Sequence, residues 1–190
     1  MKVLVIGGSK SGKSMLGQDI AKVLEDKEGK LYYLATMKPY DKEDLRRIAN
    51  HLQDREGYGF TTIEESLDMK KASQEIGSED TVLLDSITSL VTNSMFRGRD
   101  FFDRIVEETL EGVNSICEKA GSVVIVSDYV FCDSIVYDSY TEAFRRELGT
   151  VNRRLSELSD VVLECSYGNV ICHKGGELLK ETHSHIHSNE

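Results

Sequence analysis

The sequence predicts an α/β fold with a mostly parallel sheet, helices on both faces and an antiparallel hairpin at the C-terminal edge. A glycine-rich motif follows the first apolar run, and short apolar runs then alternate with helical patterns along the chain. Two final strand-like runs are joined by a short turn. A chain of 190 residues can bury a core as one unit. We therefore expect a single nucleotide-binding domain over residues 1–176 and a polar, flexible tail over 177–190.

The first predicted element is a strand over residues 3–6 that leads into the motif G-x-x-x-x-G-K-[ST]. Glycines in this motif let backbone N–H groups surround a phosphate, while Lys13 supplies a positive charge and Ser14 a hydroxyl for Mg²⁺. A chance match in a glycine-rich turn is the alternative, and the strand before and helix after argue against it. The predicted phosphate site comprises Gly7, Gly8, Ser9, Lys10, Ser11, Gly12, Lys13 and Ser14.

The next elements follow from periodicity and turn residues. The helix that opens at Lys13 ends near the polar turn at 26–30, and a buried strand follows at 31–35. A second helix is predicted over 41–53 with Asp41 as its N-cap. After it we expect, in order, a brief strand at 60–64 and a helix at 67–76.

An apolar run over residues 81–85 ends in Asp85, which predicts a carboxylate beside the Mg²⁺ of a phosphate-loop enzyme. The alternative reading of Asp85 is a helix N-cap or turn residue, because such strands are common. A helix with polar caps is expected directly after it, over residues 86–93. Combined with the upstream motif, Asp85 is the predicted metal partner of Ser14.

Helical spacing of apolar residues is predicted to continue over 101–119, and a buried strand follows at 123–126. The clearest apolar stripe of the chain runs from Tyr140 to Leu158, and we interpret it as core rather than a cofactor site. Strand-like runs at 161–165 and 169–173 predict the terminal hairpin. Alternating strands and helices imply ligands at the carboxyl ends of the strands.

Composition limits the classes of partner. A net charge of -10 argues against a general nucleic-acid or anionic-membrane surface. No apolar run is long enough to span a bilayer, so we expect a soluble, cytoplasmic protein. The four cysteines form no C-x-x-C pair and are interpreted as reduced structural thiols. Alternate histidines at 183, 185 and 187 could bind a metal weakly, but a frayed tail is the preferred interpretation.

Several separate stretches together resemble the bifunctional adenosylcobinamide kinase and adenosylcobinamide-phosphate guanylyltransferase family of cobalamin biosynthesis, the CobU family. The phosphate loop carries the form Gly-Gly-x-x-Ser-Gly-Lys-Ser, and Tyr-Leu-Ala-Thr follows the second strand at residues 33–36. Arg47-Ile48 stands three residues before His51, which Arg55 follows four residues later. The later matches are Leu-Asp-Ser-Ile-Thr at 84–88, Val-Thr-Asn at 91–93, Phe-Arg at 144–145, Gly149 and Asn-Arg at 152–153.

The resemblance implies a RecA-like phosphate-loop fold, often trimeric, with ATP and GTP as substrates and Mg²⁺ as cofactor. It also implies phosphorylation of adenosylcobinamide, followed by GMP transfer from GTP through a guanylylated His51. From sequence alone His51 would be an ordinary helical histidine, and the resemblance makes it the predicted nucleophile. Arg47, one helical turn away, and Arg55 are candidate cations for the phosphate oxygens. Glu64 and Asp85 complete the expected nucleotide-binding set.

The chain departs from the family pattern mainly over residues 128–137, where Asn-Glu-Val-Gly and then Gly-Ile-Val-Pro are usual. Tyr129 stands where the carboxylate is expected, and Asp128 and Asp133 lie nearby in sequence. Glu56 replaces a usual proline, and Phe60 replaces a usual tryptophan. Two alternatives therefore stay open: an enzyme that retains only the kinase activity, and a nucleotide-binding switch or partner subunit without catalysis. A nucleic-acid motor on the same fold fits poorly with the acidic charge.

Overall fold

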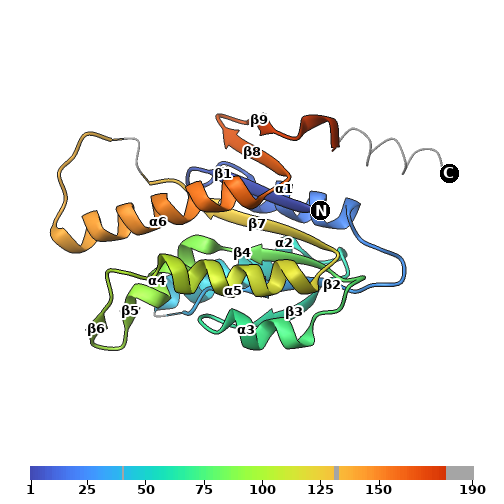
Figure 1. Cartoon of the computed structure of the whole chain (residues 1–190), viewed down its shortest axis with the longest axis horizontal. Helices are drawn as coiled ribbons and strands as arrows, with labels where there is room; N and C mark the ends of the chain where they lie inside the picture. Colours follow the sequence, from blue (N-terminus) through green and yellow to red (C-terminus); the bar gives the residue numbers. More distant parts are fainter. Residues whose placement is uncertain (40, 131–132, 179–190) are drawn as a thin grey trace.

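The computed structural model describes residues 1–39, 41–130 and 133–178. Within the helix α2 (Lys42–Asp54) it describes the backbone but not the side chains of Asp44, Arg47, Asn50, His51 and Asp54. Seven strands form one sheet in the order β3-β2-β4-β7-β1-β8-β9 (Figure 1). The six strands from β3 to β8 pair in parallel, and β9 pairs antiparallel to β8 at the edge.

The strands of this sheet match the predicted apolar runs closely. Their bounds are β1 (Lys2–Gly7), β2 (Leu31–Ala35), β3 (Thr61–Glu64), β4 (Thr81–Asp85), β7 (Ser122–Asp128), β8 (Val161–Ser166) and β9 (Asn169–Lys174). The β8–β9 turn places Tyr167 and Gly168 at φ values of 50° and 76°, as two-residue hairpin turns require. The predicted mostly parallel sheet with an antiparallel C-terminal hairpin is therefore confirmed.

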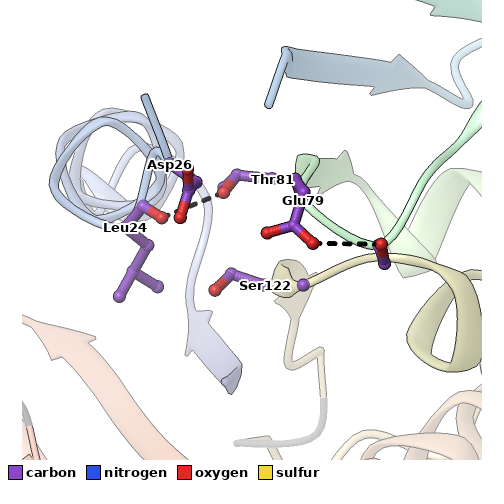
Figure 2. A pocket seen from close by; sticks show the side chains of 7 residues that line it. Leu24, Asp26, Glu79, Thr81 and Ser122 are labelled. Atoms are coloured by element: carbon purple, nitrogen blue, oxygen red, sulfur yellow. Dashed lines mark hydrogen bonds between the residues drawn. The ribbon is translucent and has the colours of Figure 1, made fainter. Parts of the chain in front are cut away.

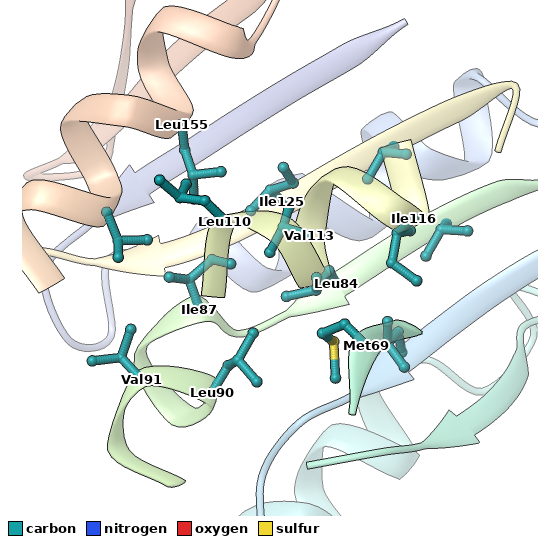
Figure 3. Packing of buried hydrophobic residues seen from close by; sticks show 14 of the residues in the cluster. Met69, Leu84, Ile87, Leu90, Val91, Leu110, Val113, Ile116, Ile125 and Leu155 are labelled. Carbon is teal, nitrogen blue, oxygen red and sulfur yellow. The ribbon is translucent and has the colours of Figure 1, made fainter. Parts of the chain in front are cut away.

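Four helices cover one face of the sheet: α3 (Met69–Ala72), α4 (Ile87–Met95), α5 (Val106–Lys119) and α6 (Ser139–Leu158). Figure 3 shows Ile87 and Leu90 from α4, Val113 and Ile116 from α5 and Leu155 from α6 around the strand residues Leu84 and Ile125. All these side chains are at most 1% exposed. The removal of this apolar surface from water is the main force that holds the helices on this face.

The opposite face packs against α1 (Lys13–Val23), which follows the glycine-rich loop. Buried Ile20 and Ala21 of this helix join the side chains of Val3, Val5 and Leu83 from the sheet. A Cβ added at Gly17 would lie 2.9 Å from Val126, so the glycine allows α1 to approach the central strands closely. Helices on both faces explain why the middle residues of β4 (82–84) and β7 (123–126) are all apolar.

The prediction of one helix over residues 101–119 was wrong at its start. Residues 96–101 form a short antiparallel hairpin of β5 (Phe96–Arg97) and β6 (Asp100–Phe101), and α5 begins only at Val106. Gly98 turns the chain with a φ of 68°, and Phe101 packs against Phe96 with ring centres 5.3 Å apart. Phe101 pairs with Phe96 in this hairpin and Phe102 is 44% exposed, so the helical spacing holds only from Ile105, the buried N-cap residue of α5.

Other helical predictions were confirmed with smaller differences. The helix predicted over 67–76 divides into α3 and the 3-10 helix η1 (Ser73–Glu75). The carboxylate of Asp41 accepts the N–H of Glu43 at 2.8 Å, as expected before α2. The stripe along α6 is core only in its middle, since Tyr140 and Leu158 are 56% and 44% exposed. Tyr140 in the first turn packs edge-on against Phe101 of β6, with ring centres 4.7 Å apart.

Within the described ranges, no helix is long and apolar enough to cross a membrane. The described cysteines are free thiols, of which Cys165 is buried, Cys117 is partly buried and Cys172 is exposed. Cys132 and the three tail histidines lie outside the described residues, so the interpretations made for them stay predictions.

Candidate functional site

The predicted phosphate loop lies at the carboxyl edge of the sheet, between β1 and α1. Gly7 ends β1 and pairs in register with Asp128 of β7 on one side and Cys165 of β8 on the other. The loop then enters α1 through Gly12, which has a φ of 91° that only glycine adopts without strain. Lys10 also has a left-handed φ, of 58°. These two turns bring the loop back over the end of β1 and into the helix.

The start of α1 has the properties of an anion site. Gly12 provides no side-chain cap, and the first turn contains no acidic residue. The first N–H groups of a helix have no partner within the helix, and the helix dipole favours negative charge there. The hydroxyl of Ser11 is a further polar group that is buried without a hydrogen-bond partner in the described structure. Together these features fit a bound triphosphate chain.

Lys13 is the buried cation of this loop, with a side chain 11% exposed. Its Nζ donates to the carbonyl oxygen of Gly8 at 3.2 Å and lies 2.5 Å from Oδ1 of Asp128. Asp128 ends β7, the strand between β1 and β4. The positive charge is therefore held inside the loop by a carboxylate from the neighbouring strand.

Asp85, the predicted metal partner, ends β4 at the same edge of the sheet. Its Oδ2 accepts a hydrogen bond of 2.9 Å from the hydroxyl of Tyr33 on β2. Burial, and then the nearby charge of Asp85, raise the pKa of Tyr33 far above its usual value, so this hydroxyl remains a donor. The strand end and the tyrosine together fix where the Asp85 carboxylate points.

Arg55 is buried behind this pair rather than extended into solvent. Its guanidinium lies 3.8 Å from the centre of the Tyr33 ring, a cation–π contact. Its Nη2 also donates to Oγ1 of Thr62 at 3.3 Å. Arg55 is thus connected to Asp85 through one intervening side chain.

The donors present are those that Mg²⁺ takes in phosphate-loop proteins. Such sites use one or two carboxylates, a hydroxyl and phosphate oxygens, rather than a cage made entirely of protein groups. Asp85 supplies a carboxylate at the strand ends, and Ser14 supplies a hydroxyl in the first turn of α1. The described residues contain no cluster of three or more His, Cys, Asp or Glu that could hold a metal alone. The donor set therefore fits Mg²⁺ held jointly with a nucleotide.

Three separate stretches of the chain, at residues 33–36, 84–88 and 91–93, meet beside Asp85. Thr36, which is fully buried, donates through Oγ1 to the carbonyl of Ser86 at 2.7 Å and accepts the Ser86 N–H at 2.8 Å. Asn93 on α4 donates to the carbonyl oxygens of Thr36 and Ser66 at 2.8 and 3.1 Å. The hydroxyl of Ser86 caps α4 by accepting the N–H of Ser89 at 3.3 Å. These bonds lock the loops after β2 and β4 to each other.

A second set of bonds fixes the end of β7. The N–H of Asp128 donates to the hydroxyl of Thr88 at 2.9 Å, and its carbonyl accepts Nδ2 of Asn152 at 3.0 Å. Oδ1 of the same asparagine accepts a hydrogen bond of 2.7 Å from the hydroxyl of Ser127. Thr88 lies on α4 and Asn152 on α6, so helices of one face hold the backbone that carries the partner of Lys13.

The structure describes the remaining predicted site residues only in part. His51 and Arg47 lie on α2, but their side chains are outside the described structure. Glu64 ends β3 at the carboxyl edge with an exposed side chain, in register with Ala35, which itself pairs with Asp85. Ser9 and Lys10 are exposed on the loop. Of the divergent segment at 128–137, Phe131 and Cys132 lie outside the described residues.

Two residues that contact predicted site residues, Tyr33 and Asp128, are not assigned by the sequence. In the sequence Tyr33 is one residue of the stretch at 33–36, and its hydrogen bond to Asp85 depends on the pairing of β2 with β4. In the sequence Asp128 is an acid beside the divergent Tyr129, although it ends a buried strand as Asp85 does. That shared pattern of a buried strand ending in a carboxylate was the available signal.

A small pocket also opens at the opposite edge of the sheet (Figure 2). It is lined by Leu24, Asp26, Ser78, Glu79, Thr81, Gly121 and Ser122. Thr81 and Ser122 begin β4 and β7, so the pocket faces the amino ends of the parallel strands. Ligands of open α/β sheets bind at the carboxyl ends, and this pocket is therefore separate from the phosphate loop.

Comparison with solved structures identifies the fold. The chain aligns with the solved structure of an ATPase domain at a TM-score of 0.53 and 13% identity, over 91% of this chain and 76% of that one. Together with the strand order and the loop at residues 7–14, this establishes a RecA-like P-loop fold.

Comparison with known sequences identifies the family. Proteins named bifunctional adenosylcobalamin biosynthesis protein CobU, from Salmonella typhimurium and Escherichia coli, are 28% and 27% identical over 175 residues. These alignments cover 85% of this chain and 93% of each relative. A protein named CobP from Pseudomonas aeruginosa is 26% identical over 83% of this chain and 88% of its own length. The model of the cobinamide kinase / cobinamide phosphate guanyltransferase family matches residues 3–172, and the chain therefore belongs to that family.

Proposed function

We propose that this protein phosphorylates adenosylcobinamide with a nucleoside triphosphate and then transfers GMP from GTP onto the new phosphate. The observation that carries the proposal is the position of Lys13, buried at the start of α1 on the edge of the sheet where Asp85 also lies. Family membership and the bifunctional relatives supply the substrate class. Both reactions need a bound triphosphate, which the loop at 7–14 is suited to hold.

In the kinase step, the backbone of residues 7–14 holds the phosphates. Lys13 neutralises the charge that develops on the transferring group. Ser14 and Asp85 would hold Mg²⁺, which would neutralise negative charge on the phosphates when it is bound. Tyr33 orients Asp85 for this role through its 2.9 Å hydrogen bond. The alcohol of the corrinoid side chain attacks the γ-phosphorus, and the nucleoside diphosphate leaves.

In the second reaction, His51 is the nucleophile. A neutral imidazole nitrogen forms a bond with the α-phosphorus of GTP while the bond to pyrophosphate breaks. A phosphate oxygen of adenosylcobinamide phosphate then attacks the same phosphorus, and the histidine leaves unchanged. Arg47 lies one helical turn from His51 on α2, which favours a role on the phosphate oxygens. Arg55 and Glu64 complete the proposed nucleotide site.

Labelling with GTP that carries radioactive α-phosphorus tests whether His51 is the nucleophile. The wild-type protein should acquire a label that is lost in acid and stable in alkali, as a phosphoramidate is. The variant His51→Ala should lose the label, while His173→Ala should keep it. His173 is a matched control because it lies on the distant edge strand β9, bonded to Glu164 at 2.8 Å. Undiminished labelling of His51→Ala would contradict this assignment.

The divergent segment at residues 128–137 favours a second candidate, in which guanylyl transfer or all catalysis has been lost. An enzyme with only the kinase activity would form adenosylcobinamide phosphate from ATP without covalent GMP. A nucleotide-binding switch would show a nucleotide-dependent rise in melting temperature but form no corrinoid product. One assay with adenosylcobinamide, ATP and GTP separates these outcomes. A homotrimer stays a prediction, to be checked by light scattering coupled to size-exclusion chromatography.

A further inference from the structure

Arg55 directly follows α2 and is only 9% exposed, although it carries a full positive charge. Its guanidinium carbon lies 3.8 Å from the centre of the Tyr33 ring, and Nη2 donates to Oγ1 of Thr62 at 3.3 Å. A buried charge needs such partners, because it has lost contact with water. Tyr33 lies on β2 and Thr62 on β3, so Arg55 connects the carboxyl end of α2 to the sheet.

The ring that Arg55 covers is itself firmly held. Tyr33 is 3% exposed in β2, which pairs with β3 on one side and with β4 on the other. Phe60 contacts the ring edge-on, with ring centres 5.8 Å apart, and the hydroxyl of Tyr33 donates to Asp85 at 2.9 Å. Arg55 therefore packs on a fixed part of the sheet, beside the carboxylate proposed to hold Mg²⁺.

The helix α2 itself receives little support from the core. Its apolar side chains Leu45 and Leu52 are 56% and 51% exposed. Neither they nor Ile48 belongs to the two buried clusters of the described chain. Burial of apolar surface, which holds the longer helices on the sheet, therefore contributes little to the position of α2. Contacts at the end of this helix have a correspondingly larger effect on where it lies.

We propose that Arg55 is a positioning residue for guanylyl transfer, which holds the carboxyl end of α2, and with it His51, against Tyr33. This inference rests on the proposed function, in which His51 is the nucleophile. His51 belongs to the last turn of α2, four residues before Arg55. Loss of the Arg55 contact therefore releases the turn that carries the nucleophile. Attack on phosphorus depends steeply on how closely the nucleophile is held in place.

The decisive variant is Arg55→Met, which keeps a long, flexible side chain but removes the cation from the Tyr33 ring and the donor to Thr62. Without nucleotide, amide hydrogen exchange over residues 46–54 should become about three- to thirtyfold faster, which corresponds to the loss of one cation–π contact. At saturating GTP, the rate of covalent labelling by α-labelled GTP should fall about tenfold or more. Arg55→Lys restores a cation and should recover part of both effects.

Two comparisons separate this positioning role from general damage to the protein. Phosphoryl transfer from ATP to adenosylcobinamide does not use His51, so its kcat at saturating Mg²⁺ should change less than about threefold in Arg55→Met. The control Arg46→Met makes the same substitution at an exposed arginine of α2 and should alter neither the exchange nor the labelling. Thermal melting verifies that each variant is folded.

Faster exchange in α2 combined with slower labelling of His51 is the expected result. Slower labelling with unchanged exchange would show that Arg55 acts directly on the nucleotide, and labelling of Arg55→Met at the wild-type rate would show that it has no role. Either result overturns the inference. A wild-type protein that acquires no label from GTP would instead overturn the proposed guanylyl transfer, and this inference with it.

Discussion

The hydroxyl of Tyr33 donates a 2.9 Å hydrogen bond to the carboxylate of Asp85, although the two residues are 52 positions apart in the chain. Tyr33 lies in the middle of β2 and is 3% exposed, so its ring cannot move without disturbing the core. Burial and the charge of Asp85 keep the pKa of the tyrosine high and its hydroxyl protonated. The carboxylate proposed to hold Mg²⁺ is therefore oriented by a rigid group behind it.

The first prediction is that Tyr33→Phe raises the concentration of Mg²⁺ that catalysis requires. Without its donor, the Asp85 carboxylate loses its fixed orientation, and partners of this kind typically affect metal affinity about 10- to 100-fold. We expect the Mg²⁺ concentration for half-maximal phosphoryl transfer to rise by about tenfold, measured by titration at saturating ATP.

The neighbouring residue supplies the control for this experiment. Tyr32 packs on the other face of β2, and its hydroxyl donates to the backbone carbonyl of Glu75 at 3.3 Å. Tyr32→Phe removes the same atom without touching Asp85, so it should leave the Mg²⁺ titration unchanged. Equal shifts in both variants would show that the effect comes from general loosening of the strand.

The second prediction concerns the crowded start of the phosphate loop. A Cβ at Gly7 would lie 2.7 Å from the carbonyl oxygen of Cys165 and 2.5 Å from Oγ of Ser11. Gly7→Ala must therefore push β1 away from β8 or displace the loop, and we expect the free energy of unfolding to fall by about 1–3 kcal/mol. Urea denaturation measures this change.

Substitution of the adjacent Gly8 is the control, because it shows whether crowding at Gly7 or any loss of glycine in the loop causes the destabilisation. A Cβ at Gly8 would have the Tyr129 ring as its nearest neighbour, at 4.0 Å. Gly8→Ala should therefore change the free energy of unfolding by less than about 1 kcal/mol. A Gly7→Ala variant as stable as Gly8→Ala would refute the close packing described for this loop.

The third prediction is that Glu65, which follows β3, makes a pH-dependent contribution to the free energy of unfolding. Although burial alone raises the pKa of Glu65, the N–H groups of Asp68 and Leu67, each 3.1 Å from Oε1, and the Lys71 ammonium hold it below the usual value. Because the native pKa is lowered, the charged carboxylate stabilises the folded state at pH values above the unfolded pKa of about 4.3. This stabilisation is lost as the pH falls through the native pKa.

The test compares the wild type with Glu65→Gln by urea denaturation between about pH 7 and about pH 3. At neutral pH the variant should be less stable by about 1 kcal/mol, and the difference should disappear at the acid end of this range. Glu56→Gln, at an exposed position in the turn after α2, should be neutral throughout. A difference for Glu65→Gln that is independent of pH would contradict the assigned role of its charge.

Much of the fold could be predicted because it depends on residues close together in the chain. Apolar runs defined the strands, glycines defined the phosphate loop and the last turn, and Asp41 marked the start of α2. The hairpin at residues 96–101 was missed because Phe102 happens to extend the helical spacing that begins at Ile105, the N-cap of α5. What decides that segment is the packing of Phe101 on Phe96 and on Tyr140 of α6, a residue far along the chain.

The sequence by itself determined the triphosphate loop, the acid at the end of β4 and the family resemblance, since each is a pattern within a short stretch. Only the tertiary structure decided that Asp128 faces Lys13 and that Tyr33 holds Asp85. Both pairs depend on strand order, which places β7 between β1 and β4 and β2 beside β4. Strand order follows from burying both faces of the whole sheet at once, and no local pattern contains that condition.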